Sequence, residues 1–233
     1  MSFCCLNLQV IFKDEKVLST ADLDINNKSF HVERATFCDN SITSLRKVWE
    51  KSCSVIEIDF SRNKIVHIES GAFASFRALN KLHFSNNKLS QLKRDQFLGL
   101  SELHQLLLDN NKITTLGDGV FEHLTNLKRL VLDGNKIRFR KEMFDGLQTL
   151  EELSLDNCGI TDLEVDAFHS IPLVAVECIQ CLLKNIRVPH SISFRFLQIY
   201  QGSGTFTYPL KCESCSSPQH AEGRYLLHNC SYS

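Results

Sequence analysis

Apolar and polar positions along this chain follow one phrase that recurs about every 24 residues. Aliphatic or aromatic residues occupy positions 1, 4, 6, 11 and 14 of the phrase, and Asn occupies position 9. One clear copy runs through Leu103, Leu106, Leu108, Asn111, Ile113 and Leu116. Other copies begin at residues 32, 55, 79, 127, 150 and 173, so successive starts are 23 or 24 residues apart. This spacing predicts a stack of equivalent units with a continuous core.

The alternation at positions 3 to 7 predicts one short strand in each unit. Positions 4 and 6 would point inward and positions 3, 5 and 7 outward, because side chains alternate across a strand. Each unit is too short to bury its apolar face alone, so the units must stack with their strands parallel. We therefore expect an α/β repeat solenoid of horseshoe shape, with a parallel sheet on its concave face.

Asn at position 9 can donate and accept hydrogen bonds where the backbone turns out of the strand. This residue recurs as Asn40, Asn63, Asn87, Asn111 and Asn135, and it is replaced by Cys158 and Cys181. A second apolar column is expected on the convex side, formed by Phe73, Phe97, Phe121, Phe144 and Phe168, with Trp49 in the first copy. We interpret these aromatic residues as core.

The pattern divides the chain into three regions. Residues 1–31 are expected to form an N-terminal cap with a strand around Leu8 to Phe12. Residues 32–187 hold about seven repeats. Residues 188–233 hold an irregular last repeat, in which Leu197 arrives at a spacing of 21, and a cysteine-bearing C-terminal cap.

The cysteines outside the central repeats favour an oxidising compartment, because solenoid ends need caps and disulfides can hold them. The disulfide candidates are Cys4, Cys5, Cys38, Cys53, Cys212, Cys215 and Cys230, with their connectivity open. A leftover cysteine would allow a disulfide-linked dimer. Asn27 and Asn229 begin glycosylation sequons outside the central repeats. We therefore expect an extracellular protein, either secreted or the ectodomain of a membrane protein.

The net charge of −1, from 26 basic and 27 acidic residues, gives no reason to expect nucleic acid as a partner. No apolar run is long enough to predict a membrane span. The apolar stretch from Phe3 to Phe12 lacks a basic start, so whether it is a signal peptide stays open.

These motifs resemble extracellular leucine-rich repeat proteins of the typical 24-residue class. The opening phrase, Val32-Glu-Arg-Ala-Thr-Phe through Asn40-Ser-Ile-Thr-Ser-Leu, is also similar to the first repeat of insect, particularly mosquito, leucine-rich immune proteins. That resemblance implies innate-immune recognition of a protein partner. No heptad run of the kind that extends some of those proteins follows the repeats in this sequence, so that means of engaging a partner is missing or was cut away. The tail also departs from the Cys-x-Cys cap of receptor ectodomains.

The register places the candidate partner-binding residues on the concave face. They are Glu57, Asp59, Lys81, His83, Gln105, Leu107, Asp109, Arg129, Val131, Asp133, Glu152, Ser154 and Asp156. At position 7, Ser61 and Ser85 precede three Asp residues, and such an acidic stripe would be repulsive unless cations offset it. Leu107 and Val131 are expected to form a small apolar anchor beside the stripe, as at the centre of a protein interface.

Catalytic and metal chemistry find little support. The chain has no Gly-rich phosphate loop, no His-Glu-x-x-His and no nucleophile elbow, so we expect neither enzyme activity nor a cofactor. Cys178-x-x-Cys181 and Cys212-x-x-Cys215 have zinc-like spacing, but the repeat already explains the first pair as inward residues, so no metal site is expected. The alternatives to a secreted binding protein are a fragment of a larger extracellular receptor or adhesion protein, and an intracellular leucine-rich repeat scaffold with free thiols.

Overall fold

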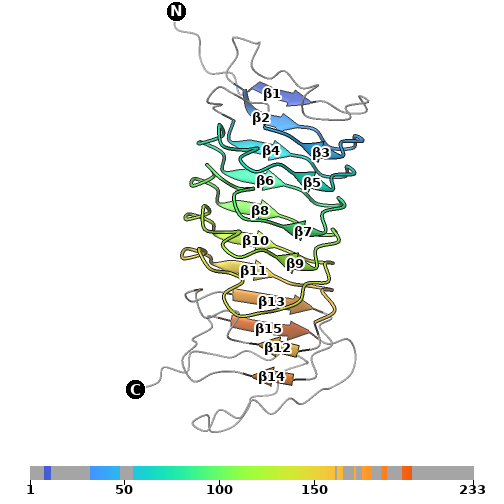
Figure 1. Cartoon of the computed structure of the whole chain (residues 1–233), viewed down its shortest axis with the longest axis vertical. Helices are drawn as coiled ribbons and strands as arrows, with labels where there is room; N and C mark the ends of the chain where they lie inside the picture. The colour runs from blue at the N-terminus through green and yellow to red at the C-terminus, as the bar shows by residue number, and fades with distance from the viewer. Residues whose placement is uncertain are drawn as a thin grey trace, which may run out of the picture.

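The fold is a solenoid of stacked coils, each contributing one strand to a long sheet (Figure 1). The computed structural model describes residues 8–11, 32–47, 55–160, 162–164, 171, 175–179, 185–187 and 196–200. The long sheet has nine parallel strands in the order β1-β2-β4-β6-β8-β10-β11-β13-β15. They are β1 (Leu8–Ile11), β2 (Val32–Thr36), β4 (Glu57–Asp59), β6 (Lys81–His83), β8 (Gln105–Leu107), β10 (Arg129–Val131), β11 (Glu152–Ser154), β13 (Ala175–Ile179) and β15 (Phe196–Tyr200).

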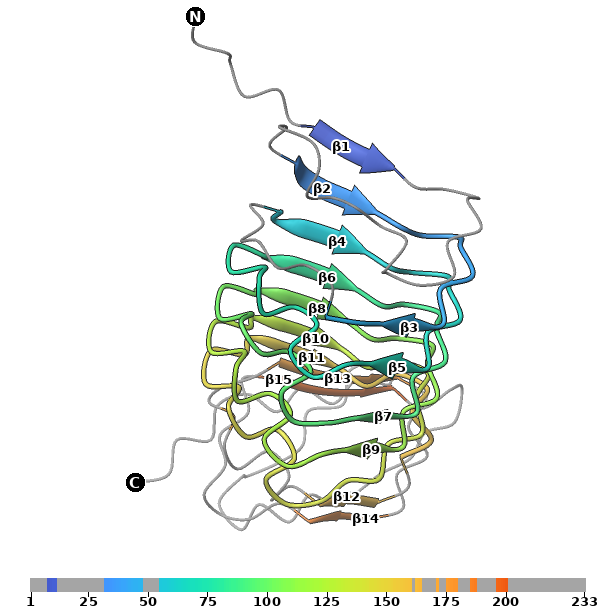
Figure 2. The same cartoon turned by 45° about the horizontal axis from the view of Figure 1, so that its top comes forward.

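Short strands line the opposite side of the coils (Figure 2). They are β3 (Ser44–Leu45), β5 (His67–Ile68), β7 (Gln91–Leu92), β9 (Thr115–Leu116), β12 (Asp162–Glu164) and β14 (Asn185–Arg187). These strands pair in parallel as β3-β5, β7-β9 and β12-β14. The expected horseshoe, with a long parallel sheet on its concave face, is confirmed.

Strand pairing confirms the phase of the repeat. Position 4 of one coil faces position 4 of the next, as where Leu106 pairs with Leu82 on one side and Leu130 on the other. Val176 of β13 pairs with Leu197 of β15, so the copy that arrives after 21 residues still joins the sheet in register. The strand predicted near Leu8 is β1, which pairs with β2.

Two apolar columns fill the interior of the coils. At position 6, the rings of Phe37, Phe60 and Phe84 stack with centroids 5.1 and 5.5 Å apart. Stacked rings at this separation add to the free energy of burying their apolar area. The predicted convex column is also core, since four of its members are fully buried: Phe73, Phe97, Phe121 and Phe144. Trp49 and Phe168 lie outside the described residues.

The position 9 amides form the expected ladder between coils. Asn111 Oδ1 accepts a hydrogen bond from the Leu89 amide at 3.1 Å, and its Nδ2 lies 2.9 Å from Phe84 O and 3.0 Å from Leu108 O. Asn63, Asn87 and Asn135 repeat this pattern in their own coils. Each side chain therefore satisfies backbone groups of its own coil and of the preceding one.

Cys158 takes the same position and is buried, with its thiol donating to Leu132 O at 3.3 Å. This agrees with the prediction of a small buried residue and a weaker donor at that point of the ladder. Cys178 lies at position 6 of its repeat, in register with Ile199, whereas Cys181 lies outside the described residues.

A residue with left-handed backbone conformation at position 8 turns the chain out of the strand in six successive coils. The φ angles of Asp39, Arg62, Asn86, Asn110 and Asn157 lie between 53° and 59°. Gly134 has φ 67° at the same position, and a Cβ there would lie 2.7 Å from Asn110 Oδ1. The turn thus recurs coil after coil with a short polar residue or Gly at most copies, as left-handed backbone favours.

The disulfide candidate Cys38 lies within the described residues, and there it is buried and has no cysteine partner. Burial together with a hydrogen bond to Asp39 raises the pKa of its thiol. It occupies position 7 of the first repeat, next to the turn residue Asp39, and its bridge stays a prediction. The other six candidates lie outside the described residues: Cys4, Cys5, Cys53, Cys212, Cys215 and Cys230.

Candidate protein-binding face

The outward side chains of the long sheet form three parallel rows, one for each of positions 3, 5 and 7. The position 3 row contains charges of both signs. Arg34 Nε lies 3.4 Å from Glu57 Oε2, and Arg129 Nε lies 2.9 Å from Glu152 Oε1. Exposed Lys81 and half-buried Gln105 lie between these pairs. The row is therefore a polar border in which opposite charges meet across neighbouring strands.

The position 5 row runs along the middle of the face. Half-buried Leu107 of β8 has His83 on one neighbouring strand and Val131 on the other. Val131 is only 7% exposed, and Ser154 on the next strand is only 5% exposed. The expectation that these two side chains offer contact area is therefore wrong. They are short and lie recessed between neighbouring strands, so Leu107 supplies most of the accessible apolar anchor.

The position 7 row carries the acidic stripe, and the structure shows what offsets part of its repulsion. Ser85 Oγ donates to Asp109 Oδ1 at 2.5 Å. Ser154 Oγ donates to Asp133 Oδ1 at 2.7 Å, and the Asp156 amide donates to the same oxygen at 2.8 Å. These hydroxyl and amide donors stabilise the carboxylates in place. The stripe is thus an ordered part of the sheet edge, with all three carboxylates half-buried.

His83 adds a feature that sequence reasoning missed. Its Nε2 is enclosed by the protein, yet among the described residues it has no hydrogen-bond partner. A buried nitrogen without a partner is unfavourable by about 1–3 kcal/mol. A donor or acceptor from a bound molecule would relieve this, and His83 lies directly beside Leu107 in the sheet register. No sequence pattern marks this nitrogen, because its enclosure depends on neighbouring coils.

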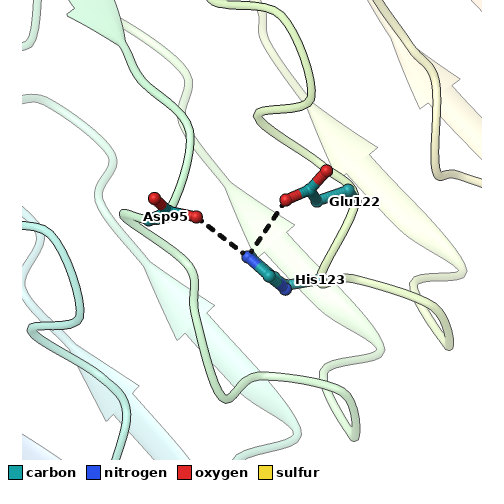
Figure 3. A group of neighbouring side chains, drawn as sticks. All are labelled: Asp95, Glu122 and His123. Carbon is teal, nitrogen blue, oxygen red and sulfur yellow. Dashed lines mark hydrogen bonds and ion pairs between the residues drawn. The ribbon is translucent and has the colours of Figure 1, made fainter.

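A second cluster of charged side chains lies in the loops away from this face (Figure 3). His123 Nε2 is 3.2 Å from Asp95 Oδ1 and 3.3 Å from Glu122 Oε1. Arg94 Nε occupies the same Glu122 oxygen at 2.7 Å, and this hydrogen bond raises the pKa of Arg94. The side chains of Asp95, Glu122 and His123 are of types that can bind a metal ion, but here they already contact each other and the Arg94 guanidinium. We interpret the cluster as a link between the loops of neighbouring coils.

The sequons at Asn27 and Asn229 lie outside the described residues. In the part of the chain that the structure describes, no helix has the length and hydropathy needed to cross a bilayer.

Stacked coils, one continuous parallel sheet and a buried Asn ladder define a repeat protein of the solenoid class. The chain belongs to the leucine-rich repeat family. The sequence model of that family matches residues 36–89, 53–113, 77–137 and 101–160, together more than half of the sequence. Membership of this family makes the chain a binding protein and not an enzyme. No curated protein matches the chain.

Solved structures of the same fold include receptor ectodomains. A crystal structure of TLR13 in complex with ssRNA13 is 26% identical with a TM-score of 0.55, and the match covers 65% of this chain and 25% of that one. The Drosophila Toll–Spatzle complex, described as a hub in development and innate immunity, is 21% identical with a TM-score of 0.57, covering 67% and 21%. The chain thus spans about a quarter of the length of these proteins or less.

Proposed function

We propose that this chain is an extracellular recognition module that binds a protein partner through the concave sheet face, in an innate-immune setting. The observation that carries the proposal is the arrangement of the three outward rows. An apolar centre at Leu107 lies between a charged border at position 3 and an acidic border at position 7. Protein interfaces commonly combine an apolar centre with a polar rim.

Rigidity supports the same proposal. The backbone of β8, at the centre of the face, is fixed by parallel pairing on both sides, and Asp109 and Asp133 are held by hydrogen bonds to neighbouring coils. Binding would then order few groups, so little of the favourable contact energy would be lost to conformational entropy. The enclosed Nε2 of His83 offers one further polar contact at the centre of the face.

Charge favours a protein over a nucleic acid at this face. Three carboxylates line its edge at Asp109, Asp133 and Asp156, where they would repel phosphates. The similar structures include one complex with RNA and one with a protein, so the partner's class is a point for experiment. The innate-immune setting is supported by the similarity to the Toll–Spatzle complex, a hub in innate immunity, and by the resemblance of the first repeat to insect leucine-rich immune proteins.

The partner can be identified by capture from extracellular fluid on the secreted, immobilised chain, followed by mass spectrometry and a measured affinity. We expect Leu107→Glu to weaken binding of that protein by about tenfold to a hundredfold, roughly 1.4–2.8 kcal/mol. Leu98→Glu is the matched control, because it makes the same substitution, with the same change in charge, at an exposed leucine of the preceding coil that is not part of the three outward rows. Equal effects of the two substitutions would remove the concave face from the proposal.

The extracellular setting has its own test in the intact mass of the secreted protein. We expect glycan at Asn27 or Asn229 and bridges among the terminal cysteines, and non-reducing electrophoresis would reveal a disulfide-linked dimer. A protein with all ten thiols free and no glycan would instead favour the intracellular scaffold.

A further inference from the structure

Four consecutive coils carry lysine at position 10, on the flank where the strands of the long sheet end (right-hand edge in Figure 2). The residues are Lys64, Lys88, Lys112 and Lys136, and all four are exposed. We call them the lysine ladder. Ser41 and Gly159 hold position 10 in the coils before and after, so the ladder is bounded at both ends.

Backbone hydrogen bonds fix the ladder in register. Each lysine amide donates to a carbonyl of the preceding coil, as from Lys88 to Ile65 O at 2.9 Å and from Lys112 to Leu89 O at 2.8 Å. Lys64 and Lys136 make the equivalent bonds at 2.9 and 3.0 Å. At the spacing of parallel strands, about 4.8 Å per step, the four attachment points span roughly 15 Å.

The repeat positions next to the ladder carry no acidic residue. Position 12 projects on the same side as position 10, and there exposed Arg138 adds a fifth cation while Thr43, Ser90 and Thr114 add hydroxyls. From the coil of Ser41 to that of Arg138, positions 10 to 13 contain no Asp or Glu. This contrasts with a net charge of −1 for the whole chain.

The ladder lysines also differ in their partners from several other basic side chains. Arg34, Arg62, Arg94, Lys128 and Arg129 each form an ion pair. Among the described residues, no carboxylate pairs with any ladder lysine, and Lys64 Nζ lies 3.4 Å from Ser41 Oγ. Solvated surfaces usually mix charges of both signs, as the position 3 row does here, so an unbroken cationic row indicates an anionic ligand.

We propose that the lysine ladder binds a linear sulfated polysaccharide lying along the solenoid axis. A single row of evenly spaced ammonium groups is complementary to a polysaccharide that carries an anionic group on successive sugar units. Hydroxyls of Ser90 and Thr114 and the exposed amide of Asn86 lie on the same flank or beside it and can hydrogen-bond to sugar hydroxyls.

Nucleic acid fits the same flank less well. Proteins that hold single strands without sequence preference combine cations with exposed aromatic rings on which bases stack. The large exposed apolar side chains among the described residues are Ile56, Val66 and Leu98, and none is aromatic. The proposal concerns a surface separate from the protein-binding face and does not depend on it.

The test titrates the full chain with a size-defined heparin oligosaccharide, with single-stranded poly-uridylate of equal charge and with unsulfated dextran, at roughly 0.15 M salt. The ladder variant replaces Lys64, Lys88, Lys112 and Lys136 by Gln. The matched control replaces the same number of exposed lysines at other repeat positions: Lys47, Lys93, Lys128 and Lys141. Both variants change the net charge equally, so only the placement of the charges differs.

We expect heparin to bind the native chain more tightly than poly-uridylate and dextran, with an affinity that falls steeply as salt rises. The ladder variant should bind heparin at least about tenfold more weakly, and the control within about twofold of the native chain. The melting temperature of the ladder variant should not fall, since none of the four replaced lysines forms an ion pair with a described residue. Equal weakening in both variants, tighter binding of poly-uridylate, or no heparin binding by the native chain would each overturn the proposal.

Discussion

Asn111 shows how much one side chain contributes to a solenoid. It is 8% exposed and satisfies an amide and carbonyls in two successive coils. Asn111→Ala would leave several buried backbone groups unpaired, each at about 1–3 kcal/mol. We expect a loss of roughly 3 kcal/mol in the free energy of unfolding, measured by urea denaturation. Lys112→Ala, at the exposed neighbour, should change it by less than about 0.5 kcal/mol. Similar losses for the two variants would contradict the stabilising role of the Asn ladder.

Cys158 makes the stability depend on pH in the alkaline range. Burial raises the pKa of its thiol from 9.0 to about 12. Between these values the thiol ionises in the unfolded chain but stays protonated in the folded one, so unfolding releases a proton and stability falls as the pH rises. Below pH 9 both states are protonated and the effect vanishes.

Cys158→Ser is the comparison, because a hydroxyl of similar shape does not ionise in this range. Melting temperatures from pH 8 to 11 should fall more steeply for the native chain than for the variant. Parallel curves would mean that the thiol is accessible enough to ionise in the folded state.

At the scale of the element, each coil depends on the inward direction of its strand residues. Leu106 is fully buried between Leu82 and Leu130, while Leu107 beside it is only half-buried. Leu106→Asp places a charge in the core and should abolish cooperative unfolding and secretion. The same change at Leu107 should leave a folded, secreted protein. Circular dichroism and secretion yield of the two variants test which residues of the strand point inward. Equal tolerance of both substitutions would refute this assignment.

The strands, the Asn ladder and the aromatic columns could be predicted from sequence, because each recurs at a fixed position of the repeat. Side-chain accessibility within the outward rows could not. Val131 and Ser154 have the alternation of exposed residues, yet both are buried, because accessibility depends on the lengths of side chains one repeat away. The bonds from Ser85 to Asp109 and from Ser154 to Asp133 likewise join coils whose facing residues no local pattern couples.

At the scale of the whole molecule, two kinds of surface run parallel to the solenoid axis. The sheet face mixes charges around Leu107 and is proposed to bind a protein. The neighbouring flank carries the lysine ladder, and positions 10 to 13 of these coils contain no Asp or Glu. Since both follow repeat positions, the charge of each surface is set coil by coil, and the two can serve separate ligands on one rigid support.

The in-register parallel pairing also has a consequence for how such a chain can change length over evolution. Every coil meets its neighbours through the same positions, so removal of one whole unit, such as residues 79–102, would bring β4 against β8 with Ile58 facing Leu106. The core would close again, the lysine ladder would shorten by one rung, and the sheet face would lose Lys81 and His83. Loss of half a unit would instead set strand against turn. Gene rearrangements that respect the repeat period can therefore alter the reach of both surfaces while conserving the fold.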